Sequence, residues 1–90
     1  EAIRRYLHII KLRHKNKDIT WDGIKEQYKA QLCIDVDNDT EHGVLQFMMY
    51  VLDHYDFTEH GSSIGGCWLT EKGEMLLTVL DAWHEMENKA

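Results

Sequence analysis

In this 90-residue chain, side chains suited to binding a ligand outnumber side chains suited to catalysis. Lys25 and Lys29 lie one helical turn apart, so both ammonium groups can contact phosphate from one helix face. Farther along, between residues 38 and 63, hydroxyl, amide and imidazole groups can bind phosphate, and Gln46 can read adenine. The candidate nucleic-acid contacts are Lys25, Lys29, Asn38, Thr40, His42, Gln46, Tyr50, His60, Ser62 and Ser63.

Catalysis and zinc binding have no comparable support. Ser62 and Ser63 lie in a Gly/Ser-rich stretch with no evident base and orienting group. His54, His60 and Cys67 are candidates for zinc ligation around that stretch, but their spacing matches no zinc site. Surface histidines are the better interpretation, so no enzyme activity, cofactor or metal centre is expected.

The acids between Asp35 and Glu41 alternate in the way that those of a calcium-binding loop do. The sixth place of such a loop needs glycine and the twelfth needs a bidentate acid, but these places hold Thr40 and Gln46. The segment is therefore not an EF-hand loop, and a weak divalent-cation site is the alternative that stays open.

Cys33 and Cys67 lie far apart and have no metal-ligand spacing. Because no secretory signal is present, we expect buried thiols in a reducing compartment, with a single long-range disulfide as the alternative. No apolar run approaches the roughly 20 residues that span a bilayer, so a cytoplasmic location without membrane contact is expected. The length fits one domain over residues 1–90.

Charge is divided unevenly along the chain, whose formal net charge is −6. Residues 1–33 hold eight Lys or Arg and four acids, a net of +4, whereas residues 34–90 hold two Lys and twelve acids, a net of −10. The overall sign argues against a general affinity for phosphate backbones. The split predicts a protein with a basic end and an acidic end.

Three amphipathic helices are predicted, over about residues 2–15, 21–32 and 39–55. Thr20 is placed to cap the second helix, and Asn38 followed by Glu41 matches a capping box at the start of the third. Met49 and Tyr50 are expected on the flanks or outer side of the third helix. The expected core-facing residues are Ile3, Tyr6, Leu7, Ile9 and Ile10, then Trp21, Ile24, Tyr28 and Leu32, then Val44, Phe47, Met48, Val51, Leu52 and Tyr55.

Residues 56–60 and 67–69 have strand character, and the Gly/Ser-rich stretch between them predicts a hairpin loop. Thr70 then caps a last helix. The core-facing positions of that helix are Leu76, Leu77, Leu80 and Trp83. The order indicates an α+β, mostly α domain: a winged helix-turn-helix with three helices, a β-hairpin wing and a C-terminal helix.

The stretch from Val44 to Leu77 resembles winged-helix regulators of the MarR and PadR kind. The most specific part is Leu69-Thr70-Glu71-Lys72-Gly73, at the exit from the second strand into the last helix. Here Gly73 allows close packing in the first helical turn. The chain departs from the family in two respects: Tyr55 or Asp56 replaces the turn glycine after the third helix, and that helix carries no Arg or Lys.

The resemblance implies a DNA-binding transcriptional regulator that acts as a dimer on double-stranded DNA. Terminal helices commonly form the dimer interface in that family. The last helix here also has more apolar positions than one buried face needs. The expected homodimer interface is Met75, Val79, Trp83 and Met86.

A protein-interaction module on the same scaffold is the alternative function. Acids crowd the start of the third helix, where phosphates would have to approach: Asp35, Asp37, Asp39 and Glu41. An acidic face can dock a basic protein, and an inhibitor from a phage or mobile element that mimics the charge of DNA is a bolder version. The resemblance favours DNA as the partner, and the charge pattern favours a protein.

Overall fold

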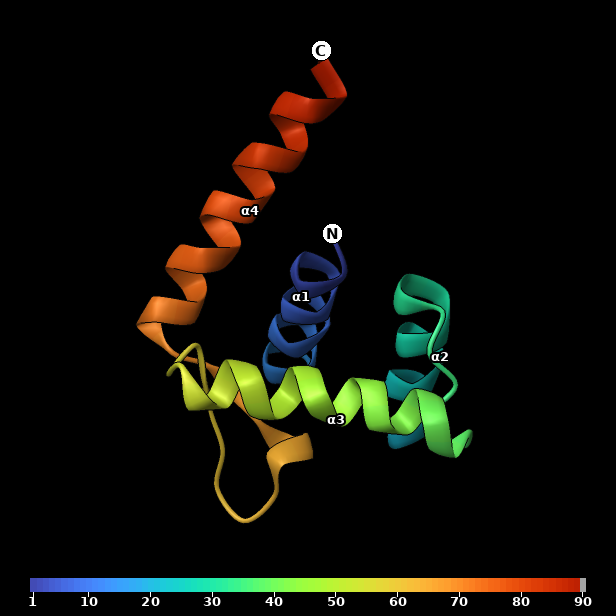
Figure 1. Cartoon of the computed structure of the whole chain (residues 1–90). Helices are drawn as coiled ribbons and strands as arrows, with labels where there is room; N and C mark the ends of the chain where they lie inside the picture. The colour runs from blue at the N-terminus through green and yellow to red at the C-terminus, as the bar shows by residue number, and fades with distance from the viewer. Residues whose placement is uncertain (90) are drawn as a thin grey trace.

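The computed structural model describes residues 1–89 of the chain. Over this range the fold is α+β and mostly helical, and its elements follow the predicted order (Figure 1). The elements are α1 (Ala2–Lys15), α2 (Trp21–Leu32), α3 (Asp39–His54), β1 (Thr58–Glu59), the short 3-10 helix η1 (Ile64–Gly66), β2 (Trp68–Leu69) and α4 (Glu71–Lys89). None of the helices in the described range is long and apolar enough to cross a membrane.

Side-chain caps define the starts of three helices, as the sequence predicts. The cap distances are 3.1 Å from Gly23 N to Thr20 Oγ1, 3.1 Å from Glu41 N to Asn38 Oδ1 and 3.0 Å from Gly73 N to Thr70 Oγ1. Each cap satisfies a backbone amide that the first helical turn leaves without a partner. The three polar residues therefore fix where α2, α3 and α4 begin.

The capping box expected at the start of α3 forms only in part. The Asn38 side chain accepts a bond from Glu41 N, but the Glu41 carboxylate does not bond back to Asn38 N. Instead, Glu41 Oε1 accepts a bond from Asp35 N at 3.3 Å, and Asn38 N donates to Asp35 O at 3.0 Å. The loop before α3 turns back on itself, so the Glu41 side chain bonds to an earlier amide than the box would require.

The core lies where α1 packs against the other elements, and α1 contributes most to it. Tyr6, Leu7, Ile9 and Ile10 are buried, as predicted, whereas Ile3 near the start of α1 is exposed. The buried apolar residues of the rest of the chain are Ile24, Tyr28, Ile34, Val36, Leu45, Met49, Leu52, Cys67 and Leu77. The helix that is richest in cations is thus also the most central one.

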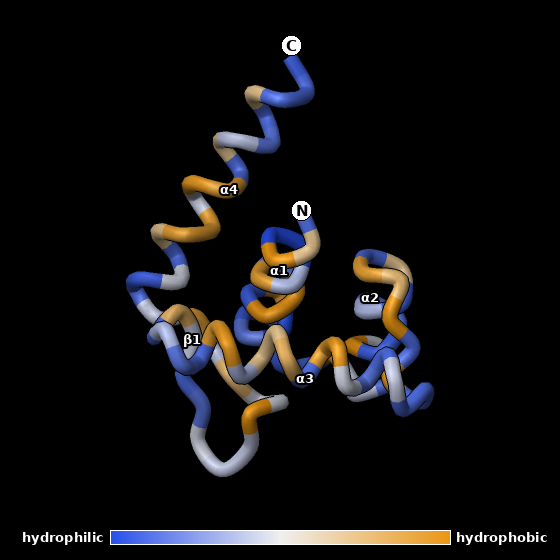
Figure 2. The backbone as a smooth tube through the Cα atoms, in the orientation of Figure 1, coloured by the Kyte–Doolittle hydropathy of each residue, from blue (hydrophilic) through white to orange (hydrophobic). Residues whose placement is uncertain are grey.

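The buried face of α3 differs from the predicted face. Leu45, Met49 and Leu52 are buried, whereas Val44 and Phe47 are 52% and 70% exposed. Of the predicted set, Leu52 is buried and Met48 packs at the margin of the core. Periodicity alone cannot select a face here, because apolar residues occur around most of the circumference of α3 (Figure 2).

Four further residues expected inside are exposed: Trp21, Cys33, Tyr55 and Trp83. Trp21 is the first residue of α2, next to its cap. Cys33 ends that helix in the left-handed conformation with φ 56°. Tyr55 follows the last residue of α3 as its C-cap. These three lie at the ends of elements, whereas Trp83 lies within α4 and is 59% exposed on the side away from the core.

The hairpin is shorter than the predicted strands, because only Thr58 pairs with Leu69 and Glu59 with Trp68. Asp56 precedes it at φ 65°, a left-handed conformation that glycine or Asp/Asn adopts most readily. Asp56 thus adopts the left-handed conformation at the position where the resemblance would place a turn glycine. Gly73 packs against the same turn, since a Cβ at this position would lie 2.0 Å from Phe57 O. The close packing predicted for this glycine is confirmed.

Candidate interaction surfaces

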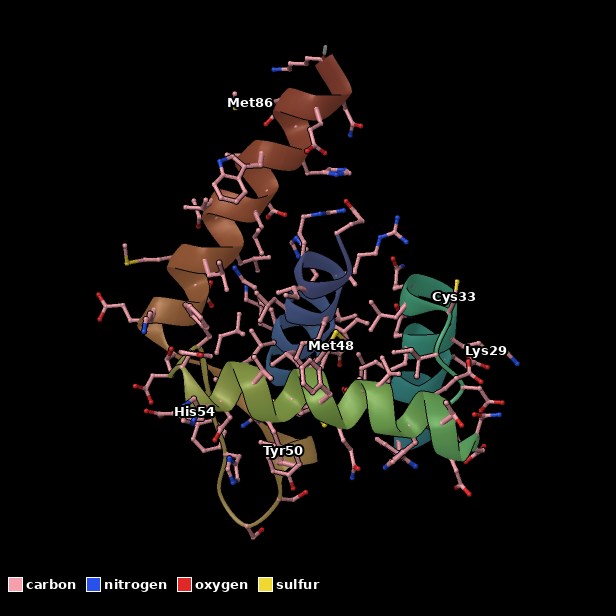
Figure 3. All side chains as sticks on the ribbon, viewed as in Figure 1. Lys29, Cys33, Met48, Tyr50, His54 and Met86 are labelled. Carbon is pink, nitrogen blue, oxygen red and sulfur yellow. The ribbon has the colours of Figure 1, made fainter. Side chains whose placement is uncertain are left out.

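The outer face of α3 carries a row of aromatic and apolar side chains, of which Phe47, Tyr50 and His54 are exposed and Val51 is partly buried. Phe47, Tyr50, Val51 and His54 follow the i, i+3, i+4, i+7 spacing that places residues on one side of a helix. This side lies opposite the buried face of the same helix. Tyr50 projects toward the hairpin and Met48 toward the opposite edge of α3 (Figure 3). We call these four residues the α3 ridge.

A hollow adjoins the C-terminal end of the α3 ridge. Its lining residues are Phe47, Tyr50, Val51, Asp53, His54 and Tyr55. The His54 and Tyr55 rings meet edge to face with centroids 5.0 Å apart. The hollow therefore combines aromatic walls with one carboxylate, a lining that suits an apolar or cationic side chain.

The residues of α3 and of the segments next to it carry charge of one sign. Two cations from other elements reach this region: Lys25 Nζ lies 3.0 Å from Asp37 Oδ2, and Lys72 Nζ donates to Tyr55 O at 2.8 Å. Residues 30–71 contain no Lys or Arg. Their carboxylates are Asp35, Asp37, Asp39, Glu41, Asp53, Asp56, Glu59 and Glu71. Four of them precede or open α3, and three follow from its last turn into the hairpin, so acids flank the α3 ridge at both ends.

Four of the predicted nucleic-acid contacts are engaged inside the fold. Asn38 caps α3, and His42 Nδ1 lies 3.1 Å from Val36 O. The Lys25 ammonium lies 3.0 Å from Asp37 Oδ2, and this bond raises the pKa of Lys25 above its usual value. His60 Nδ1 lies 2.9 Å from Asp53 Oδ1. Each of these groups would have to leave a partner before it could contact a phosphate.

The other predicted contacts are exposed: Lys29, Thr40, Gln46, Tyr50, Ser62 and Ser63. They do not form one basic face. Lys29 projects outward from α2 (Figure 3), and it shares a hollow with Lys25 and the acids Asp22, Glu26, Asp35 and Asp37. The acids of this hollow outnumber its two cations, so the lysine pair does not create a positive surface.

Four of the five cations of α1, all except Lys15, bond to other parts of the chain. Arg4 lies 2.6 Å from Glu1 and 3.3 Å from Asp81, and Lys11 lies 3.1 Å from Glu74. Arg5 lies 2.9 Å from Glu1 and donates to Gln31 O at 2.9 Å. The bonds from Arg4 and Arg5 lower the pKa of Glu1 to about 2. The predicted basic end is thus largely neutralised within the fold.

Arg13 is the cation that holds the hairpin. Its guanidinium donates to the backbone oxygens of Gly65 and Cys67 and lies 3.8 Å from the Cys67 sulfur. The buried Cys67 thiol in turn lies 3.4 Å from the Tyr6 hydroxyl. These contacts hold α1 against η1 and β2, so the Arg13 guanidinium has a structural role.

The outer face of α4 carries a second exposed apolar row, which we call the α4 stripe. Met75, Val79, Trp83 and Met86 are 66%, 41%, 59% and 68% exposed, so the predicted interface residues do lie on the surface. Met86 projects from α4 on the side away from α1 (Figure 3). The opposite side of α4 packs on the core through Leu77, with Leu76 and Leu80 partly buried.

The structure places no His, Cys, Asp or Glu cluster suited to a metal ion within residues 1–89. In the acidic loop before α3, Asp35 Oδ1 accepts a bond from Asp37 N at 3.0 Å, which is a local turn contact. Cys33 and Cys67 are both free thiols. The longest rows of exposed apolar side chains on single helices are the α3 ridge and the α4 stripe, and Ile3, Leu12 and Trp21 are exposed elsewhere.

Sequence reasoning identified the α4 stripe and missed the α3 ridge. The same signal marks both, namely more apolar positions than one buried face requires.

Comparison with family models, curated proteins and solved structures gives no match for this chain.

Proposed function

We propose that this chain is a protein-interaction module on a winged-helix arrangement, and that α3 and the hairpin bind a basic protein. The observation that carries the proposal is the pairing of exposed aromatic groups with charge of one sign. Phe47 and Tyr50 are 70% and 57% exposed on a segment, residues 30–71, that has no Lys or Arg. In a winged helix that binds DNA, the corresponding helix enters the major groove.

Electrostatics favours a protein partner over a nucleic acid at this surface. Binding to duplex DNA depends on cations that displace counterions from phosphates, and α3 and the hairpin offer none. Acids in those positions repel phosphate and attract Lys or Arg of a protein surface. Exposed aromatic side chains are enriched among the residues that dominate the affinity of protein interfaces.

Duplex DNA binding, which the resemblance implies, is the competing function. It would depend on cations that have no ion pair or side-chain hydrogen bond within residues 1–89, and these are Lys15, Lys17 and Lys29. They lie at the end of α1, in the following loop and on α2 rather than on α3. A protein that used them would hold DNA away from the α3 ridge.

Fluorescence anisotropy with two labelled probes at low and moderate salt separates the two functions. We expect a Lys-rich peptide to bind and a random-sequence DNA duplex not to bind. The variant D53N/D56N/E59Q should weaken peptide binding, whereas K15Q/K17Q/K29Q should leave it unchanged. Duplex binding that falls steeply with salt and is lost in K15Q/K17Q/K29Q would instead establish the DNA function.

A second observation supports a homodimer in which the α4 stripe of one subunit packs on that of its partner. The stripe is apolar over most of a 19-residue helix and faces away from the core. Glu71 and Lys89 stand near its two ends, eighteen residues apart, which is five turns at 3.6 residues per turn. They therefore lie on the same flank of α4.

This flank indicates the orientation of the two helices. An antiparallel pair centred near residue 80 brings Glu71 against the partner subunit's Lys89, and the symmetry repeats the contact. In a parallel pair the two Glu71 residues would lie on opposite sides of the interface at one end and the two Lys89 residues at the other end, so the Glu71–Lys89 contact could not form. The stripe is centred between Met75 and Met86, so the same register also aligns the apolar residues.

Charge exchange tests the dimer and its orientation together. We expect E71K and K89E each to shift sedimentation equilibrium toward monomer, and the double variant to restore the dimer. E87K changes a charge on the other flank and is the matched control. A concentration-independent monomer mass would remove the dimer, and a double variant no better than the single ones would remove the antiparallel register.

A further inference from the structure

We infer that the partner of the α3 ridge is an amphipathic helix of another protein, with apolar residues on one face and Lys or Arg near both ends. The inference rests on the proposed function and adds the secondary structure and residue pattern of the partner. Three features of the surface carry it: the geometry of the α3 ridge, the hollow beside it and the placement of the acids.

The geometry of the α3 ridge matches the way in which helices pack. Residues 47, 50, 51 and 54 span two turns of α3 and form a row whose neighbouring grooves accept a similar row from a second helix. The hollow next to Phe47 and His54 can receive one larger side chain from that row. An i, i+3, i+4, i+7 set of apolar residues on the partner would therefore mirror the set on α3.

A strand is a poorer partner for this part of the molecule. Strand addition needs a free sheet edge that offers several backbone groups in a row. The hairpin pairs only Thr58 with Leu69 and Glu59 with Trp68, so its edges are two residues long. The exposed groups around the α3 ridge are side chains, because the backbone amides and carbonyls of α3 bond within the helix.

The positions of the acids favour a partner helix that carries Lys or Arg near both of its ends. Asp39 and Glu41 stand in the first turn of α3, and Asp53 stands in its last part. Asp56 and Glu59 continue the acidic surface into the hairpin. A helix that lies along the α3 ridge passes between these groups, so cations at both of its ends would each meet a carboxylate.

Designed peptides test the inference without knowledge of the natural partner. The probe is a labelled, end-capped helical peptide with leucines on one face and lysines on the others. One control peptide has the same composition with its leucines spread around the helix. A second has a central proline, which breaks the helix, and a third has glutamates in place of the lysines. Binding is measured by anisotropy with the full chain.

We expect the helical Leu/Lys peptide to bind at least about tenfold more tightly than each control peptide. F47A/Y50A should weaken its binding by a similar factor while circular dichroism shows the same helix content. L12A/W21A is the matched control, because it removes exposed apolar surface from α1 and α2, away from the α3 ridge and the α4 stripe. That variant should leave peptide affinity unchanged.

The outcomes separate the inference from the proposed function. Equal binding of the helical, scrambled and proline peptides would overturn the helix inference and leave an acidic protein-binding surface. Tight binding that F47A/Y50A does not weaken would also overturn it, because the α3 ridge would not be the site. If no lysine-containing peptide binds and the DNA duplex does, both the inference and the proposed function fail.

Discussion

Helices α1 and α3 use their polar and apolar side chains in opposite ways. In α1 the apolar residues are the centre of the core, and Arg4, Arg5, Lys11 and Arg13 all bind other elements. In α3 one face is buried, and a second apolar face, centred on Phe47, is exposed among acids. A helix whose charged groups hold the fold together has few of them left for a ligand.

This difference changes the interpretation of the charge split along the chain. Counted by sequence, the first third is a basic end that could bind phosphate. In three dimensions its guanidinium and ammonium groups neutralise Glu1, Glu74 and Asp81 or bond backbone carbonyls. The acids around α3 remain largely uncompensated by Lys or Arg. The segment around α3 and the hairpin therefore keeps more of its acidic charge than the basic first third keeps of its positive charge.

The largest effect is expected from core truncation, which tests the face that α3 buries. Leu45→Ala removes a side chain that is 1% exposed and should lower the free energy of unfolding by about 2–5 kcal/mol. Val44→Ala removes a side chain that is 52% exposed and should change it by no more than about 0.5 kcal/mol. Urea unfolding followed by circular dichroism measures both. A larger loss for Val44→Ala than for Leu45→Ala would mean that α3 buries the face predicted from sequence.

The next effect concerns the structural use of cations in α1. Arg13→Ala leaves the Gly65 and Cys67 carbonyls without their donor and should cost about 2–3 kcal/mol, because hydrogen bonds from charged donors are among the strong ones. Lys15→Ala removes a cation two residues further along, at the C-terminal end of the same helix, and should cost less than about 0.5 kcal/mol. The same unfolding experiment compares them. A loss for Lys15→Ala as large as that for Arg13→Ala would contradict the account.

The smallest effect is a dependence of stability on pH at the contact between α1 and α4. Glu1 has a folded pKa of about 2 against 4.5 for the free side chain, so its contribution is present above about pH 4.5 and is lost as pH falls toward 2. Bonds from His8 and Arg4 outweigh the effect of burial and also lower the pKa of Asp81.

We therefore expect Glu1→Gln to lower Tm slightly at pH 6, and the difference from the native chain to vanish near pH 2. Thermal unfolding over that range provides the measurement. A difference between the two proteins that stayed constant from pH 6 to pH 2 would show that the carboxylate of Glu1 is not the group responsible.

Much of the fold could be predicted from the sequence because local signals determine it. Thr20, Asn38 and Thr70 mark helix starts by capping chemistry, which depends on neighbouring residues only. The buried set of α1 follows from periodicity, since the cations occupy its other faces. Gly73 could be assigned to close packing because it follows the capping residue Thr70 by three positions, which places it in the first turn of the helix.

The surfaces were harder to predict, because they depend on contacts between distant elements. With apolar residues around most of α3, only packing against the rest of the fold determines that Leu45 is inside and Phe47 outside. The partners of Arg13 lie 52 and 54 residues away in the sequence, so the charge count alone assigns this residue to the basic end. The same limitation applies to Lys25, which Asp37 binds from the following loop.

The most direct test of the central claim is a chemical-shift map of the 15N-labelled chain titrated with the Leu/Lys helical peptide. We expect chemical-shift perturbations centred on residues 46–59, with Phe47, Tyr50 and His54 among the largest and the middle of α1 little changed. Perturbations centred instead on Lys15, Lys17 and Lys29, and produced by duplex DNA but not by the peptide, would contradict the claim and assign the chain to nucleic-acid binding.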